Sequence, residues 1–205
     1  MMKKIAALVL GLSMTLSTQA HMLWLERTPD QQTKLFFGEL SEHALETQQG
    51  LLKYFNDVLV IQNKQKIKNT AKNSDHLIYP TQGTSDVNSK YQVIYEDALL
   101  HYYAKSGRLN LVADSELDIV PNSANSNAFT VFYQGKAATN IKVTVFSPQH
   151  WMKNYTTNSQ GQISIETPWK GQYIIEVTKE SDQSGTFNQQ PYKKQHLVTT
   201  LSFIQ

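Results

Sequence analysis

Apolar and polar residues alternate in short runs along most of the chain, which is the pattern of β-strands with one buried face. The runs are rich in aromatic and β-branched residues and are separated by Asn, Gln, Ser, Gly and Lys, a composition that favours strands and turns over long helices. In the first half, the predicted strands cover residues 23–26, 34–39, 58–61, 91–95 and 99–104. In the second half they cover residues 129–133, 141–147, 163–166, 171–178 and 196–203.

Two segments depart from this pattern. Residues 41–55 have some helical character and predict a short helix or an irregular lid. Residues 118–127 contain Pro121 and the polar run 122–127, which is typical of a linker. We therefore predict an all-β protein with two consecutive antiparallel β-sandwich domains of the immunoglobulin or prealbumin-like type, over residues 21–120 and 121–205.

The first twenty residues predict a secretory signal peptide. Lys3 and Lys4 precede the mostly apolar run 5–17, and small residues stand at Thr18 and Ala20 before the expected cut. The apolar run is shorter than the roughly 20 residues that a membrane-spanning helix needs. We expect cleavage after Ala20, a mature chain that begins with His21 and has no membrane anchor, and a periplasmic or secreted location.

Charge and cysteine content narrow the function. Loss of Lys3 and Lys4 leaves 17 basic residues against 17 acidic ones, so no nucleic-acid partner is expected. The chain has no cysteine, which excludes thiolate metal sites and thiol redox chemistry. Metal ligands would have to be His, Met, carboxylates or the terminal amine.

The second half resembles a prealbumin-like or carboxypeptidase-regulatory β-sandwich. The resemblance lies in the Gly135-Lys136 turn, the turn over residues 157–161 and the sequence 171–173, Gly-Gln-Tyr. It implies a fold and carries no function, because such sandwiches occur in many exported proteins.

A second resemblance covers nearly the whole mature chain. It rests on His-Met-Leu-Trp-Leu-Glu at 21–26, Phe-Gly-Glu at 37–39, Gly-Leu-Leu at 50–52, Tyr-Ala-Lys at 103–105 and the segments 118–121, 185–187 and 196–203. These segments resemble a family of bacterial periplasmic proteins described as the nickel-uptake substrate-specific domain. The resemblance implies a link to nickel or cobalt transport and an envelope metal transporter as a partner.

A histidine at a free N-terminus also suggests metal binding on chemical grounds. Its amine and its imidazole Nδ1 can close a chelate ring on one ion, and nitrogen ligands suit Cu(II) and Ni(II). One further imidazole would complete a three-nitrogen histidine brace. We take His196, His43 and His101 as the candidates, with no order among them. Carboxylates of Glu39, Glu42 and Glu46 could also reach an ion, and their spacing would align them on one helical face if the segment were helical.

The main hypothesis is a periplasmic accessory protein that captures or delivers nickel, copper or cobalt without catalysis. We find no convincing catalytic constellation and no nucleotide-binding glycine motif. From His21 and the resemblance, the predicted cofactor is a divalent transition metal, namely nickel, copper or cobalt. One alternative is a copper monooxygenase with a histidine brace and Tyr102 or Tyr103 as axial residue. Another is a non-catalytic interaction module of the cell envelope, in which His21 is incidental.

Overall fold

The computed structural model describes residues 21–205, so the predicted signal peptide lies outside the described residues. Within this range the chain is all-β, as predicted, with nineteen strands and two short 3-10 helices. The strands form three larger sheets and one small hairpin.

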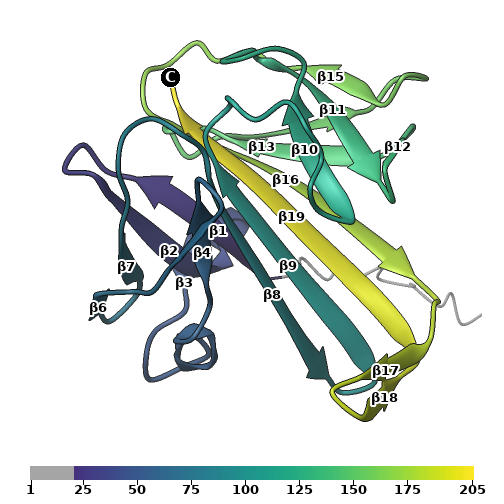
Figure 1. Cartoon of the computed structure of the whole chain (residues 1–205). Helices are drawn as coiled ribbons and strands as arrows, with labels where there is room; N and C mark the ends of the chain where they lie inside the picture. The colour runs from purple at the N-terminus through teal and green to yellow at the C-terminus, as the bar shows by residue number, and fades with distance from the viewer. Residues whose placement is uncertain (1–20) are drawn as a thin grey trace, which may run out of the picture.

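The largest sheet has eight strands and runs through the middle of the molecule (Figure 1). Its order is β14 (Met152–Thr156), β13 (Lys142–Phe146), β16 (Gln172–Ser181), β19 (Lys194–Ile204), β9 (Ala98–Ser106), β8 (Val87–Tyr95), β4 (Val60–Gln62) and β5 (Gln65–Ile67). Strands from both halves of the sequence therefore share one sheet. The two halves meet where β19 pairs with β9, and this pairing is parallel, whereas all other pairings described are antiparallel.

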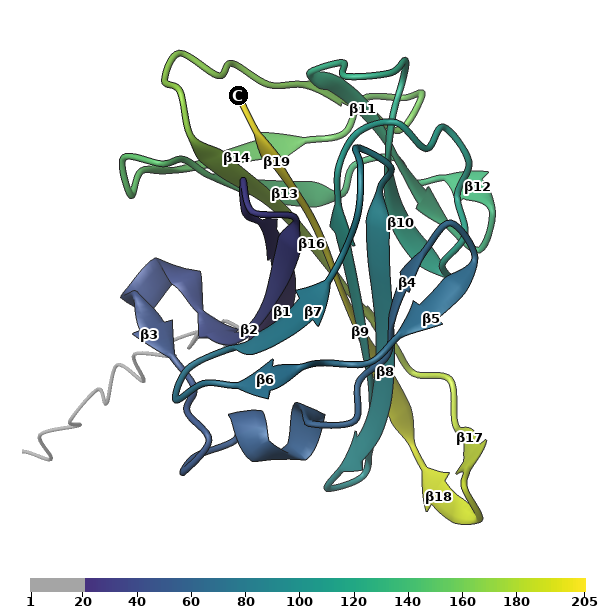
Figure 2. The ribbon, with the colours of Figure 1, turned by 60° about the vertical axis from the view of Figure 1, so that its left-hand side comes forward.

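A five-stranded sheet covers one face of the central sheet (Figure 2). It contains β1 (Met22–Arg27), β2 (Gln32–Glu39), β3 (Ala44–Leu45), β6 (Ala71–Lys72) and β7 (Leu77–Pro80). The core between the two sheets includes Trp24, Leu25, Phe37, Tyr102 and Val198.

A four-stranded sheet covers the opposite face. It contains β10 (Leu117–Pro121), β11 (Ala128–Tyr133), β12 (Lys136–Ala137) and β15 (Gln162–Ser164). Its core includes Ile119, Val131, Ile175, Leu201 and Phe203. The remaining strands, β17 (Gly185–Phe187) and β18 (Gln190–Tyr192), form a hairpin beyond the end of the central sheet (Figure 1).

Strand β19 joins the two cores because it is buried on both faces. Leu197 and Leu201 belong to one core and Val198 to the other, as expected when successive side chains point to opposite faces. The hydroxyls of two successive residues donate hydrogen bonds to opposite sheets: Thr199 Oγ1 to the Leu117 carbonyl at 2.7 Å and Thr200 Oγ1 to the Leu23 carbonyl at 2.8 Å. A continuous central strand thus holds β1 and β10 in place.

The short helical structure predicted within residues 41–55 consists of two 3-10 helices, η1 (Leu40–Glu42) and η2 (Leu52–Phe55), with β3 between them. The predicted linker needs correction. Residues 118–121 of the predicted linker belong to β10, whose five residues are all buried. Asp118 can be buried there because Lys105 Nζ lies 2.8 Å from its Oδ1, and each side chain is about one-twentieth exposed. Independent folding of 21–120 and 121–205 stays a prediction.

Candidate metal centre

His21 immediately precedes β1 at the rim of the five-stranded sheet. Its imidazole packs against the Phe37 ring, with centroids 5.3 Å apart, and its side chain is 38% exposed. The Nε2 atom lies 2.8 Å from Oε1 of Glu46. The ring is thus fixed from one side by an aromatic contact and at one nitrogen by a carboxylate.

Glu46 is positioned by the short strand β3. The Glu46 amide donates to the Phe37 carbonyl at 2.9 Å, which places its side chain beside β1. The Leu51 amide donates to Glu46 Oε2 at 3.0 Å, so both carboxylate oxygens are engaged. The Leu51 amide, followed by His21, lowers the pKa of Glu46 and keeps it ionised.

Gly38 permits the strand pairing that carries Glu46. It pairs with Leu45 of β3, and a Cβ at this position would collide with the Ala44 carbonyl oxygen. A side chain at residue 38 would therefore push β3, and with it Glu46, away from β2.

The His21–Glu46 contact determines which ring nitrogen is available. A carboxylate accepts the Nε2 proton, so the neutral ring keeps its lone pair on Nδ1. Nδ1 makes no hydrogen bond within residues 21–205. It is also the nitrogen that can close a chelate ring with the amine of an N-terminal histidine. A histidine held at one nitrogen by a carboxylate and free at the other is the usual arrangement around protein-bound metals.

The other predicted carboxylates do not align on a helical face, because no helix is present there. Glu39 ends β2 and accepts a hydrogen bond from Ser41 Oγ at 2.9 Å, and Glu42 lies exposed in η1.

Sequence reasoning missed Glu176 of β16, whose strand neighbour Thr200 contacts β1. Burial raises the pKa of Glu176 to about 7; Lys142 opposes this shift and the charge of Glu39 adds to it. A single charge within the apolar run 173–177 was the available signal.

The predicted histidine partners lie in three different places. His43 ends η1, and its ring contacts that of His150. His196 lies on β19, with Nδ1 3.3 Å from Oε1 of Glu180. Neither ring forms a hydrogen bond, an ion pair or a ring–ring contact with His21, whose partners in the described part of the chain are Glu46 and Phe37.

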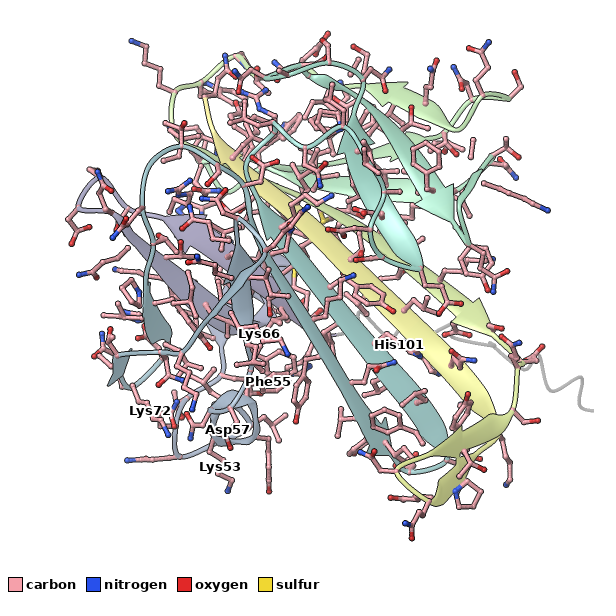
Figure 3. The ribbon with its side chains drawn as sticks, viewed as in Figure 1. Lys53, Phe55, Asp57, Lys66, Lys72 and His101 are labelled. Carbon is pink, nitrogen blue, oxygen red and sulfur yellow. The ribbon has the colours of Figure 1, made fainter. Side chains whose placement is uncertain are left out.

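His101 lies on the wrong face of the central sheet to join His21. Tyr102 packs on the Phe37 side with ring centroids 5.4 Å apart, and its neighbour His101 points to the opposite face, toward Tyr103. Figure 3 shows His101 on the part of the central sheet away from β1. The ring is buried, which lowers its pKa, and its Nδ1 lies 3.0 Å from both Gln92 Nε2 and the Tyr103 hydroxyl.

The aromatic ring against His21 is therefore Phe37, and neither Tyr102 nor Tyr103 contacts it. Burial raises the pKa of both tyrosines to about 12.

No group of three or more His, Asp or Glu side chains within residues 21–205 is arranged to hold a metal ion. Any ion at His21 must take further ligands from the amine freed by cleavage, from water, or from side chains that move.

Comparison with protein families and with curated proteins finds no match to this chain. The resemblance to the nickel-uptake family therefore stays a prediction. Within the described residues, no helix is long and apolar enough to cross a membrane.

Proposed function

We propose that this protein is a periplasmic or secreted accessory protein that binds nickel, copper or cobalt through His21 after cleavage at Ala20. The observation that carries the proposal is the contact between His21 Nε2 and Glu46 at 2.8 Å, which leaves Nδ1 available. Cleavage would add a primary amine on the same residue. Together these atoms provide two nitrogen ligands in the combination that Cu(II) and Ni(II) favour.

The surroundings of His21 suit capture of an ion more than a reaction. The ring is partly exposed, so an ion can reach it from solvent, and Phe37 closes the side toward the core. Glu46 makes the imidazole a stronger donor by drawing on its Nε2 proton. No structural observation here favours the monooxygenase alternative. An envelope transporter is the partner that a capture protein of this kind would serve.

The experiment compares two forms of the mature protein that begins at His21, one with a free terminal amine and one with this amine acetylated. Metal-free samples are titrated with Ni(II) and Cu(II) by calorimetry, and bound metal is measured by elemental analysis. We expect the native terminus to bind one equivalent tightly and the acetylated form to lose this tight equivalent, because acetylation turns the His21 amine into an amide with no lone pair for the ion. Weaker binding at other histidines should be the same in both forms. Equal affinity in the two forms would show that the terminal chelate does not exist and would favour the interaction-module alternative.

A further inference from the structure

We propose that His43 and His150 form a second, independent metal site on the surface of the protein. The two rings lie edge to face, with centroids 4.9 Å apart and planes at 85°. Two imidazoles that share an ion, with N–metal bonds of about 2.0–2.1 Å and tetrahedral or square-planar angles, have centroids roughly 4.5–5.2 Å apart. The centroid distance already present therefore lies within the range that a shared ion requires.

This pair differs from the other histidines of the chain. Of the six histidines, His21, His76 and His196 each lie against a carboxylate, and His101 is buried. His43 and His150 are both exposed, and within the described residues neither ring makes a hydrogen bond or an ion pair. Their lone pairs can thus reach an ion from solvent without breaking an existing contact.

The two backbones that carry these rings are well fixed. His43 closes η1, where its amide donates to the Leu40 carbonyl at 3.2 Å. His150 lies in the turn between β13 and β14, where its amide donates to the Ser147 carbonyl at 3.1 Å. Figure 2 shows the β3 region and the β13–β14 turn on the same side of the molecule. Two segments about a hundred residues apart in sequence therefore present their imidazoles together, which reduces the entropy lost on binding.

The chemistry of the pair defines the ligand. Imidazole nitrogens suit Cu(II), Ni(II) and Zn(II), with Cu(II) the strongest of the series. Because no third protein ligand is in place, water would complete the coordination, and the ion would remain exchangeable. Such a site would hold a metal loosely at the surface, as suits collection before delivery.

The test uses the mature protein carrying His21→Ala, so that the terminal chelate does not contribute. Cu(II) alone is titrated by calorimetry, and its nitrogen ligands are counted from the hyperfine pattern in electron paramagnetic resonance. The variants are His43→Asn and His150→Asn, because both residues have left-handed backbones, with φ of 52° and 59°, which Asn tolerates. His196→Asn is the matched control, since it removes one surface imidazole from outside the pair.

We expect one equivalent of Cu(II) with two imidazole ligands, and a loss of affinity of about tenfold or more in each variant of the pair, with no change in the control. Unchanged affinity in His43→Asn and His150→Asn would overturn the proposal, as would an equal loss in all three variants. Urea unfolding of each variant identifies any that has lost its fold. Failure here leaves the proposal for His21 standing, because that site is tested with the native terminus.

Discussion

Removing the carboxylate of Glu46 should weaken metal binding at His21 without unfolding the protein. The contact at 2.8 Å is a charge-assisted hydrogen bond, a type that contributes about 1.5–3 kcal/mol. The lower end of that range applies, because the His21 side chain is 38% exposed and the Glu46 side chain 23%. This contact exists before the ion binds, so only the energy that it gains on binding changes the affinity. Loss of such a carboxylate partner typically costs about 10- to 100-fold, and for this partly exposed pair Glu46→Ala should raise the dissociation constant of Ni(II) or Cu(II) roughly 10- to 30-fold.

The measurement is calorimetric titration of the mature protein in a weakly coordinating buffer at about 0.15 M salt, where long-range charge effects are largely screened. Glu42→Ala is the matched control, since it removes an exposed negative charge four positions away that does not contact His21. Glu46→Gln should lie between the control and Glu46→Ala, because an amide oxygen can still accept the Nε2 proton but carries no charge.

Equal affinities for Glu46→Ala and Glu42→Ala would refute this reasoning. That result would mean that Glu46 acts only through the net charge of the region, or that His21 does not bind the ion. Titration of the unsubstituted mature protein, with its terminal amine free and with it acetylated, separates these two explanations, because tight binding that needs the free amine shows that His21 binds the ion.

Three further predictions concern other parts of the molecule. Lys105→Met should lower the free energy of unfolding, measured in urea, by about 3–5 kcal/mol, since it leaves Asp118 buried without its ionic partner. The double variant Lys105→Met, Asp118→Leu should recover most of this loss, because it removes the buried charge as well. In metal-free protein, the free energy of unfolding of the wild type should fall as pH rises from 4.5 to about 7, because Glu176 keeps its proton in that window only in the folded state. Compared with the wild type, Glu176→Gln should therefore be more stable by about 1–3 kcal/mol at pH 8 and equally stable at pH 4. A stability difference that does not change with pH would contradict this. Gly38→Ala should displace β3 and weaken Ni(II) binding as much as Glu46→Ala does, and unchanged binding would show that Glu46 does not depend on the β2–β3 pairing.

The fold class was predictable because the alternation of apolar and polar residues reports directly on strands. The predicted strands 23–26, 34–39, 99–104 and 129–133 all lie within β1, β2, β9 and β11. The strand β10 was missed because Asp118 and Pro121 look like linker residues in isolation. Lys105 Nζ and the Asp114 amide, each 2.8 Å from an Asp118 oxygen, make a buried aspartate acceptable there, and neither contact is evident from the sequence.

The candidate site was predictable only in part. His21 and Glu46 were both named from sequence, and the structure brings them together. Their roles were not predictable, because the hydrogen bond depends on β3 returning along β2. The separation of His101 from His21 follows from the face of β9 on which His101 lies, and strand pattern alone cannot say which face of β9 meets β1. The contact between His43 and His150 joins two turns whose proximity is set by how the two sheets pack.

The position of β19 has a consequence for the order in which the protein can fold. This strand contains the last residues of the chain, Lys194–Ile204, and it lies between β16 and β9 in the middle of the central sheet. Until β19 has been synthesised, β9 is paired only with β8, β1 lacks the Thr200 hydroxyl, and neither hydrophobic core can close. Closure of both cores must therefore follow synthesis of β19, and so many contacts between distant residues make folding slow. The two cores should thus form together, around the central strand that they share.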